Sequence, residues 1–140
     1  MGDLIDKIKP MLIANEACVL RPYKCTANKL TIGVGRNLED KGISNDEAMY
    51  MLDNDIKEVL DDLRSVVPFD VMPQDAQLAL VDLRFQVGSL GFRRFVNMRR
   101  ALDRGDYAEA AKEMADSAVH RNKATHARSQ RRVDLLAGCG

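Results

Sequence analysis

The sequence predicts an α+β protein that is mostly α-helical, with one small β-containing region near its N-terminus. Two patterns predict this fold class. Apolar residues recur at helical spacing in residues 3–15 and again from residue 44 onward. Between these stretches, residues 17–37 are rich in β-branched, aromatic and turn-forming residues. A third observation is length, because 140 residues fit one compact domain or one domain of two small lobes.

A helix and a short run of strands make up the predicted N-terminal part. The helix covers residues 3–15, and Pro10 either kinks it or begins a second helical piece. Residues 19–35, VLRPYKCTANKLTIGVG, then predict two or three short antiparallel strands with tight turns. Gly33 and Gly35 indicate a close approach of the backbone or positive φ angles.

Helix-capping residues predict only helices from residue 44 onward. Ser44 and Glu47 form a capping box, which begins one helix of about 20 residues or two helices broken near Asn54. Proline, glycine and further capping residues mark the remaining helix ends. In chain order these are Pro73, Gly88, Gly105, Asp106 with Glu109, Thr125 and Gly138.

Positive and negative charges balance in number but not in position. The chain has 21 Lys and Arg residues and 21 Asp and Glu residues. Acids dominate residues 38–62, arginines dominate residues 84–104, and residues 118–132 contain bases but no acid. Two interpretations fit this pattern equally and stay open. The charges either lie on solvated helix faces or form a basic lobe that binds an anionic polymer.

Cysteine count and hydropathy argue against a secreted or membrane-spanning protein. The cysteines, Cys18, Cys25 and Cys139, are odd in number and form no disulfide framework, which suits a reducing cytoplasm. Charged residues interrupt the N-terminal apolar residues, so no signal peptide is expected. No apolar run approaches the roughly 18 residues of a membrane span, so we expect no stable membrane insertion.

Three residues in and beside the predicted strands carry candidate chemistry. Glu16 lies where helix gives way to sheet; partial burial there would favour its protonated form and suit a general acid, whereas a surface helix end is the simpler alternative. Thr31 can hold a water or a sugar hydroxyl, although threonine is also a common strand former. Cys25 follows Lys24, which favours a thiolate, although an isolated cysteine is more often inert.

Other kinds of site find little support. His120 and His126 lack a cysteine or acid at ligand spacing, so no metal site is expected. The GVG sequence lacks the third glycine and the following helix of a dinucleotide-binding loop, and no serine sits in a G-x-S-x-G turn. Spacing alone therefore predicts a soluble two-lobed domain with one suggestive glutamate.

Read together, these residues resemble the phage-type lysozymes, the endolysins of glycoside hydrolase family 24. Glu16-Ala17, residues 20–26 (LRPYKCT) and residues 31–35 (TIGVG) follow the family motif at its spacing. The sequence DLRFQVGSLGFRRF resembles the buried central helix of that family and the turn after it. The resemblance covers about residues 4–138 and therefore nearly the whole chain.

The resemblance implies a lysozyme-like fold with a cleft between two lobes. The small β lobe is expected at about residues 16–43, and the helical lobe at about residues 67–140 plus the N-terminal helix, with a long helix joining them. The implied reaction is hydrolysis of the β-1,4 bond between N-acetylmuramic acid and N-acetylglucosamine in bacterial peptidoglycan, without a cofactor, for host cell lysis by a phage. A monomer is implied, which stays in the host cytoplasm until a holin releases it to the periplasm or cell wall.

The resemblance also implies roles for the candidate residues. Glu16 is the general acid, and Thr31 lines the cleft. Cys25 occupies the position of the second catalytic carboxylate, as in a subgroup with cysteine there. As a nucleophile it would give retention, as a holder of the attacking water it would give inversion, and as a bystander it would leave the water to Thr31. Water positioning is the favoured interpretation.

Four further residues are implied to bind substrate from the helical lobe: Phe85, Gln86, Thr125 and Arg128. Arg128 is expected to pair with Glu16 across the cleft and to orient it.

Departures from the family pattern bear on details of the cleft and on sugar preference, and two rival functions stay open beside them. Ala17 replaces a usual glycine, Arg36 stands where histidine is frequent, and tryptophan is missing after Ser117. The missing second carboxylate leaves open a lysozyme-fold protein that binds the cell wall with little or no hydrolysis, although a pure binder has no need for Glu16. The second rival binds nucleic acid through residues 126–133 (HARSQRRV), but no helix-turn-helix spacing supports it, so no nucleic-acid partner is expected.

Overall fold

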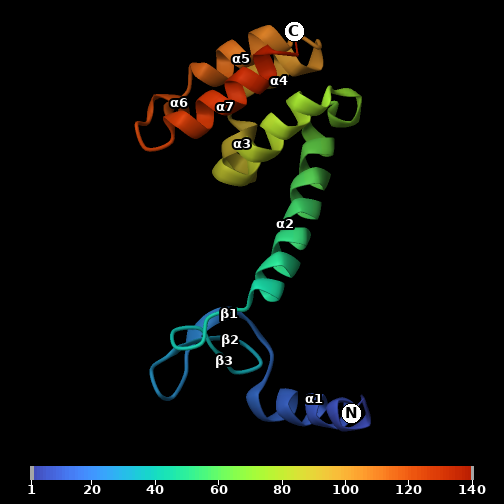
Figure 1. The fold of residues 1–140 in the computed structure, drawn as a ribbon, viewed down its shortest axis with the longest axis vertical. Helices are drawn as coiled ribbons and strands as arrows, with labels where there is room; N and C mark the ends of the chain where they lie inside the picture. Colours follow the sequence, from blue (N-terminus) through green and yellow to red (C-terminus); the bar gives the residue numbers. More distant parts are fainter. Residues whose placement is uncertain (1, 140) are drawn as a thin grey trace. The chain divides into compact units, whose positions relative to one another are not determined.

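The computed structural model describes residues 2–139, and the chain forms two compact units, Met1–Met51 and Leu52–Gly140. Helices dominate the described residues, and a small antiparallel sheet lies near the N-terminus (Figure 1). The predicted fold class, α+β and mostly α, is therefore confirmed. Membership of the N-terminal helix in the helical lobe stays a prediction. Across residues 2–139, none of the helices combines the length and the apolarity that crossing a membrane requires.

The N-terminal unit contains one helix and three strands. They are α1 (Gly2–Glu16), β1 (Val19–Lys24), β2 (Leu30–Gly33) and β3 (Arg36–Asn37). The strands are antiparallel in the order β1-β2-β3, and α1 continues through Pro10 as a single helix. Gly33 and Gly35 have φ angles of 69° and 67°, left-handed values that let the β2–β3 hairpin turn tightly, as the sequence predicted.

Helix α2 (Asn45–Val66) is continuous, and the boundary between the two compact units falls within it. The predicted capping box is present, because Ser44 Oγ accepts the Glu47 N–H at 3.1 Å and Glu47 Oε1 accepts the Ser44 N–H at 2.8 Å. The helix runs through Asn54 without interruption. The alternative of two helices broken near that residue is therefore wrong.

The C-terminal unit is a bundle of helices around an apolar core. Its elements after α2 are a 3₁₀ turn (Phe69–Val71), α3 (Gln74–Arg93), α4 (Val96–Asp103), α5 (Tyr107–Ala115), α6 (Ala118–Arg121) and α7 (His126–Ala137). Helix α7 packs against both α3 and α5, and α4 packs against α5 (Figure 1). Fully buried side chains such as Leu80, Phe92 and Met114 fill the space between these helices.

Most predicted helix boundaries in this unit hold, with two differences. Asp106 caps α5 as expected, accepting the Glu109 N–H at 3.0 Å. The helix predicted to end at Gly88 resumes after it, because Gly88 adopts a φ of 79° and introduces a kink within α3. Thr125 occupies the N-cap position of α7, but its side chain makes no capping hydrogen bond. Helix α6 is too short to have been predicted from periodicity.

Candidate active site

The candidate acid, Glu16, is the last residue of α1, and its carboxyl packs against the β2–β3 turn. A Cβ atom on Gly35 would lie 3.0 Å from Glu16 Oε2, so a side chain there would crowd the carboxyl. Ala17 follows with a φ of 60° and ends the helix through a 2.8 Å hydrogen bond from its N–H to the Ile13 carbonyl. The Glu16 side chain is exposed, which agrees with the alternative of a surface helix end and not with partial burial.

Thr31 and Cys25 meet near the beginning of β2. Thr31 is only 3% exposed, and its hydroxyl donates to the Lys29 carbonyl at 2.8 Å. A tight turn over residues 25–29 brings Cys25 to the same carbonyl. The Cys25 N–H donates to the Lys29 carbonyl at 3.0 Å, and the Asn28 N–H donates to the Cys25 carbonyl at 2.8 Å. The Thr31 hydroxyl is therefore already engaged within the sheet.

Hydrogen-bond donors of this turn lower the pKa of the Cys25 thiol. The Lys29 N–H has the largest effect, the Thr31 hydroxyl the next, and both exceed the opposing effect of burial. Thr31 has one hydroxyl hydrogen, which cannot serve the Lys29 carbonyl and a Cys25 thiolate together. We infer that the Thr31 hydroxyl donates to the Lys29 carbonyl when Cys25 is a neutral thiol. When Cys25 is a thiolate, the hydroxyl donates to the sulfur, because a thiolate is the stronger acceptor. Lys24, the neighbour that the sequence suggested as the cause, pairs with Glu39 at 2.9 Å.

A bidentate ion pair joins the β2–β3 hairpin to the first turn of α2. Arg36 Nη1 lies 2.8 Å from Glu47 Oε1, and Arg36 Nη2 lies 2.8 Å from Glu47 Oε2. Arg36 Nη1 also donates to the Gly42 carbonyl at 3.2 Å. The guanidinium holds the pKa of Glu47 at about 2, so both side chains are charged at any pH above that value.

An apolar cavity of about 570 Å³ lies beside this ion pair, within the N-terminal unit. The hairpin side chains Ile32 and Val34 line one part, and Ile43 and Tyr50 line another. None of the three candidate catalytic residues lines it. The cavity shows that apolar packing between the hairpin and α2 is incomplete.

In the C-terminal unit, the expected cationic residue Arg128 binds a carboxylate of α3. Arg128 Nε lies 3.1 Å from both oxygens of Asp82, and Arg128 Nη2 lies 2.7 Å from Asp82 Oδ1. Arg132, which is 1% exposed, donates from Nη1 to Asp82 Oδ2 at 2.8 Å and to Gln86 Oε1 at 2.6 Å. One carboxylate thus serves two arginines of α7.

Asp82 is the neighbour of the candidate site that sequence reasoning missed. Burial raises the pKa of Asp82, but hydrogen bonds from Arg128 and Arg132 outweigh burial and lower it. A signal was present, because an acid inside the otherwise apolar run LALVDL marks a charge that needs a partner when the helix is buried. Arg128 and Glu16 belong to different units, and their expected pairing stays a prediction.

The other predicted substrate-binding side chains differ in how free they are. Phe85 is 45% exposed and lines a cavity of about 260 Å³ together with carboxylates of α2. The side-chain oxygen of Gln86 is bound by the buried arginine of α7. The Thr125 hydroxyl donates to the Val119 carbonyl at 2.5 Å. Of these three side chains, Phe85 is therefore the one that is exposed to solvent.

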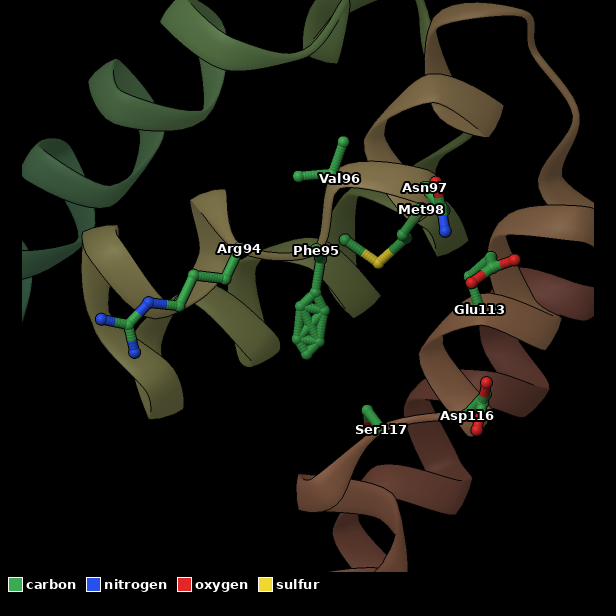
Figure 2. Close-up of a pocket in the computed structure, with 8 residues that line it drawn as sticks. All are labelled: Arg94, Phe95, Val96, Asn97, Met98, Glu113, Asp116 and Ser117. Atoms are coloured by element: carbon green, nitrogen blue, oxygen red, sulfur yellow. The ribbon is translucent and has the colours of Figure 1, made fainter.

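A further cavity of the C-terminal unit, of about 380 Å³, lies between the start of α4 and the end of α5 (Figure 2). Phe95 and Met98 project toward its middle, while Glu113 and Asp116 border it from the opposite side. Ser117, where the segment without the expected tryptophan begins, completes that border. None of the predicted substrate-binding residues lines this cavity.

Comparison with known proteins decides the family. Residues 14–134 match the family described as phage lysozyme. The chain belongs to the phage lysozyme family. It is similar to the SAR-endolysin of Escherichia phage Mu, with 30% identity over 118 residues that make up 82% of this chain and 68% of that protein. The lysozyme-like fold expected from the motif residues is thereby confirmed.

As a member of the phage lysozyme family, the chain is a glycoside hydrolase of the endolysin type that acts on peptidoglycan. The matched range contains every candidate residue that the sequence indicated. In the N-terminal unit, the structure places Glu16 at one end of β2 and Cys25 with Thr31 at the other. In the C-terminal unit, Arg128 and Gln86 share one hydrogen-bonded cluster.

Proposed function

We propose that this protein hydrolyses the β-1,4 bond between N-acetylmuramic acid and N-acetylglucosamine and so lyses the host cell at the end of a phage infection. The position of the Glu16 carboxyl beside Gly35 carries the proposal, because it places an exposed acid at the TIGVG hairpin. The name of the similar Mu protein, an endolysin, supports the same function. Cell-wall binding without hydrolysis is the alternative.

Glu16 acts as the general acid in this proposal. Its exposure lets the carboxyl reach a glycosidic oxygen, and its proton passes to that oxygen as the bond to the anomeric carbon breaks. Gly35 contributes by lacking a side chain, since a Cβ atom there would crowd the carboxyl at 3.0 Å. A carboxyl with restricted orientation is a better catalyst than a mobile one, because less conformational entropy is lost in reaching the transition state.

Cys25 holds the attacking water in this proposal. The lowered pKa of Cys25 increases the fraction of thiolate, which can accept a hydrogen bond from the water. The water oxygen then bonds to the anomeric carbon, and the proton that the water loses passes to the thiolate. This route inverts the anomeric configuration, whereas attack by the thiolate itself, followed by hydrolysis, retains it.

The helical unit supplies the remaining contacts to the glycan in this proposal. The exposed ring of Phe85 suits the apolar face of a sugar, and Gln86 and Thr125 contribute polar groups beside it. Arg128 orients Glu16 across the cleft. Since Asp82 already neutralises part of the charge on Arg128, this pairing competes less with protonation of the acid than an unpaired arginine would.

Lysis of permeabilised Gram-negative cells, followed as turbidity loss, tests the role of Glu16. Wild type lyses the cells, and Glu16→Gln lowers the rate by about 10²–10⁴-fold, the range typical of general acid catalysis. Asp6→Asn is the matched control, because Asp6 is also an exposed acid of α1 and lies away from the hairpin. Equal rates for wild type and Glu16→Gln would reject the proposed mechanism.

Cys25 variants and product analysis separate the remaining alternatives. Inverted products support water positioning, and retained products require a covalent intermediate on the thiol. A Cys25→Ser variant with full activity makes the thiol a bystander. If wild type binds purified sacculi without lysing cells while Cys25→Asp lyses them, the protein is a wall binder that lost its second catalytic group.

Release through a holin from the host cytoplasm and a monomeric state complete the proposal, both as the family resemblance implies. Expression in a bacterial host tests the first point: lysis should follow promptly when a pore-forming holin is co-expressed and should be delayed without it. Light scattering coupled to gel filtration tests the second point. A mass near the chain's 15.6 kDa is expected in reducing buffer, and a mass twice as large would contradict it.

A further inference from the structure

The β2–β3 hairpin needs something other than an apolar core to hold it in place. Among the described residues of the N-terminal unit, Thr31 is the only one that is buried. The apolar cavity of about 570 Å³ lies between the hairpin and the first turns of α2, so side-chain packing there is sparse. Polar contacts must therefore position this hairpin, which carries the residue that Glu16 packs against.

The Arg36–Glu47 pair has the geometry for this task. Two parallel contacts of 2.8 Å join the guanidinium fork to both carboxylate oxygens, and such paired contacts restrict orientation as well as distance. Glu47 is fixed in turn by the Ser44 N–H at 2.8 Å, in the first turn of α2. Arg36 is half-buried and also holds the Gly42 carbonyl, so three segments of the unit meet at one guanidinium.

The Arg36–Glu47 pair is linked to Glu16 through a single residue, Gly35. Arg36 directly follows Gly35, and the Glu16 carboxyl lies beside Gly35, 3.0 Å from where a Cβ atom on that residue would be. We propose that Arg36 and Glu47 are positioning residues for Glu16, acting through the hairpin without touching the glycan. The proposal rests on the proposed function, in which Glu16 protonates the leaving oxygen.

The leaving group of the substrate distinguishes positioning of the acid from a purely structural role. Cleavage of a natural glycan needs a proton on the leaving oxygen, whereas a nitrophenyl chitooligosaccharide releases a stable phenolate and needs the acid far less. A misplaced Glu16 therefore slows glycan cleavage selectively. A partly unfolded enzyme instead loses the same fraction of activity on both substrates.

Arg36→Lys and Glu47→Gln are the informative variants. Arg36→Lys keeps the charge but loses the fork, and Glu47→Gln keeps an oxygen for the Ser44 N–H but loses the ion pair. Each is expected to lower kcat on glycan about tenfold, with KM nearly unchanged and with less than a twofold change on the nitrophenyl substrate. Asp6→Asn is the control, since it removes an exposed charge of the same unit and should leave both rates unchanged.

Glu16→Gln measured beside these variants separates the two proposals. If Glu16→Gln shows the selective loss and the Arg36 and Glu47 variants do not, the positioning role is rejected and the acid stands. If Glu16→Gln shows no selective loss, the proposed acid itself is rejected. Equal losses of the Arg36 and Glu47 variants on both substrates would make the pair merely structural. The reversed pair, Arg36→Glu with Glu47→Arg, should recover glycan activity over either single reversal.

Discussion

The two units of the molecule are held together by different forces. All buried apolar side chains of the described residues lie in the C-terminal unit, where they form one cluster. The N-terminal unit, which contains the candidate acid, has Thr31 as its only buried described residue and relies on hydrogen bonds, ion pairs and left-handed glycines. The contrast predicts that stability and catalysis can be damaged separately, by substitutions in different units.

The largest loss of stability is expected in the C-terminal core. Phe92 is 0% exposed, and Phe92→Ala should lower the free energy of unfolding by about 3–5 kcal/mol, since it removes buried area and leaves a cavity. Val34→Ala in the N-terminal unit, at a half-exposed position, should cost less than about 0.5 kcal/mol. Urea unfolding measures both, and similar losses for the two variants would contradict the contrast between the units.

The largest loss of activity at small cost in stability is expected at Gly35. Gly35→Ala forces a left-handed residue and places a Cβ atom against the Glu16 carboxyl, so lysis should fall about tenfold while stability falls by about 1–2 kcal/mol. Gly105→Ala is the matched control, with a φ of 70° and open space for a Cβ atom. If both variants lose activity equally, backbone strain alone explains the effect and the Glu16 contact does not.

An acid-sensitive contribution to stability is expected from Asp62 of α2. Burial raises the pKa of Asp62, but bonds from Arg84 Nε at 2.6 Å and Arg93 Nη2 at 2.8 Å hold it at about 2. The usual value in an unfolded chain is about 3.9, so roughly 2 kcal/mol of stability is fully present above about pH 4 and is lost as the pH falls toward 2.

Unfolding measured at pH 7, 4 and 2.5 tests this contribution. Asp62→Asn should be less stable than wild type at pH 7. The difference should shrink at pH 2.5, because Asp62 of the unfolded wild type is protonated there, which stabilises the unfolded state relative to the folded one. A difference that stays constant across the three pH values would assign the loss to packing and not to charge.

The smallest effect is expected at Ala17, where the N-terminal unit holds backbone strain. Ala17→Gly should raise the free energy of unfolding of this unit by about 0.5–1 kcal/mol, since glycine adopts a φ of 60° without penalty. Ala14→Gly, inside α1, should instead lower it by about 1 kcal/mol. Thermal melting compares the two, and a shift of the same sign in both would argue against strain at Ala17.

Local signals in the sequence predicted most elements correctly. The capping box of Ser44, the turns at Gly33 and Gly35 and the acid cap at Asp106 each depend on residues within a few positions of one another, so they can be read along the chain. The motif around Glu16 likewise has a fixed spacing. These features are confirmed because the physics that produces them is local.

Pairings between distant segments could not be predicted in the same way. Glu47 had a sufficient role as a capping residue, so nothing in the sequence required it to bind Arg36 as well. Asp82 and Arg128 are separated by 46 positions and meet only because α3 and α7 pack together. Which carboxylate an arginine binds depends on how the helices pack. Each acidic run contains several carboxylates that the sequence alone does not distinguish as partners.

Helix α2 begins in the unit without an apolar core and ends in the unit that has one. Its buried side chains, Val59 and Leu63, both belong to its second half. Amide hydrogens in its first turns should therefore exchange with solvent orders of magnitude faster than those around Leu63, although they belong to the same helix. Protection from hydrogen exchange would then change partway along one continuous helix, at the position where its side chains become buried.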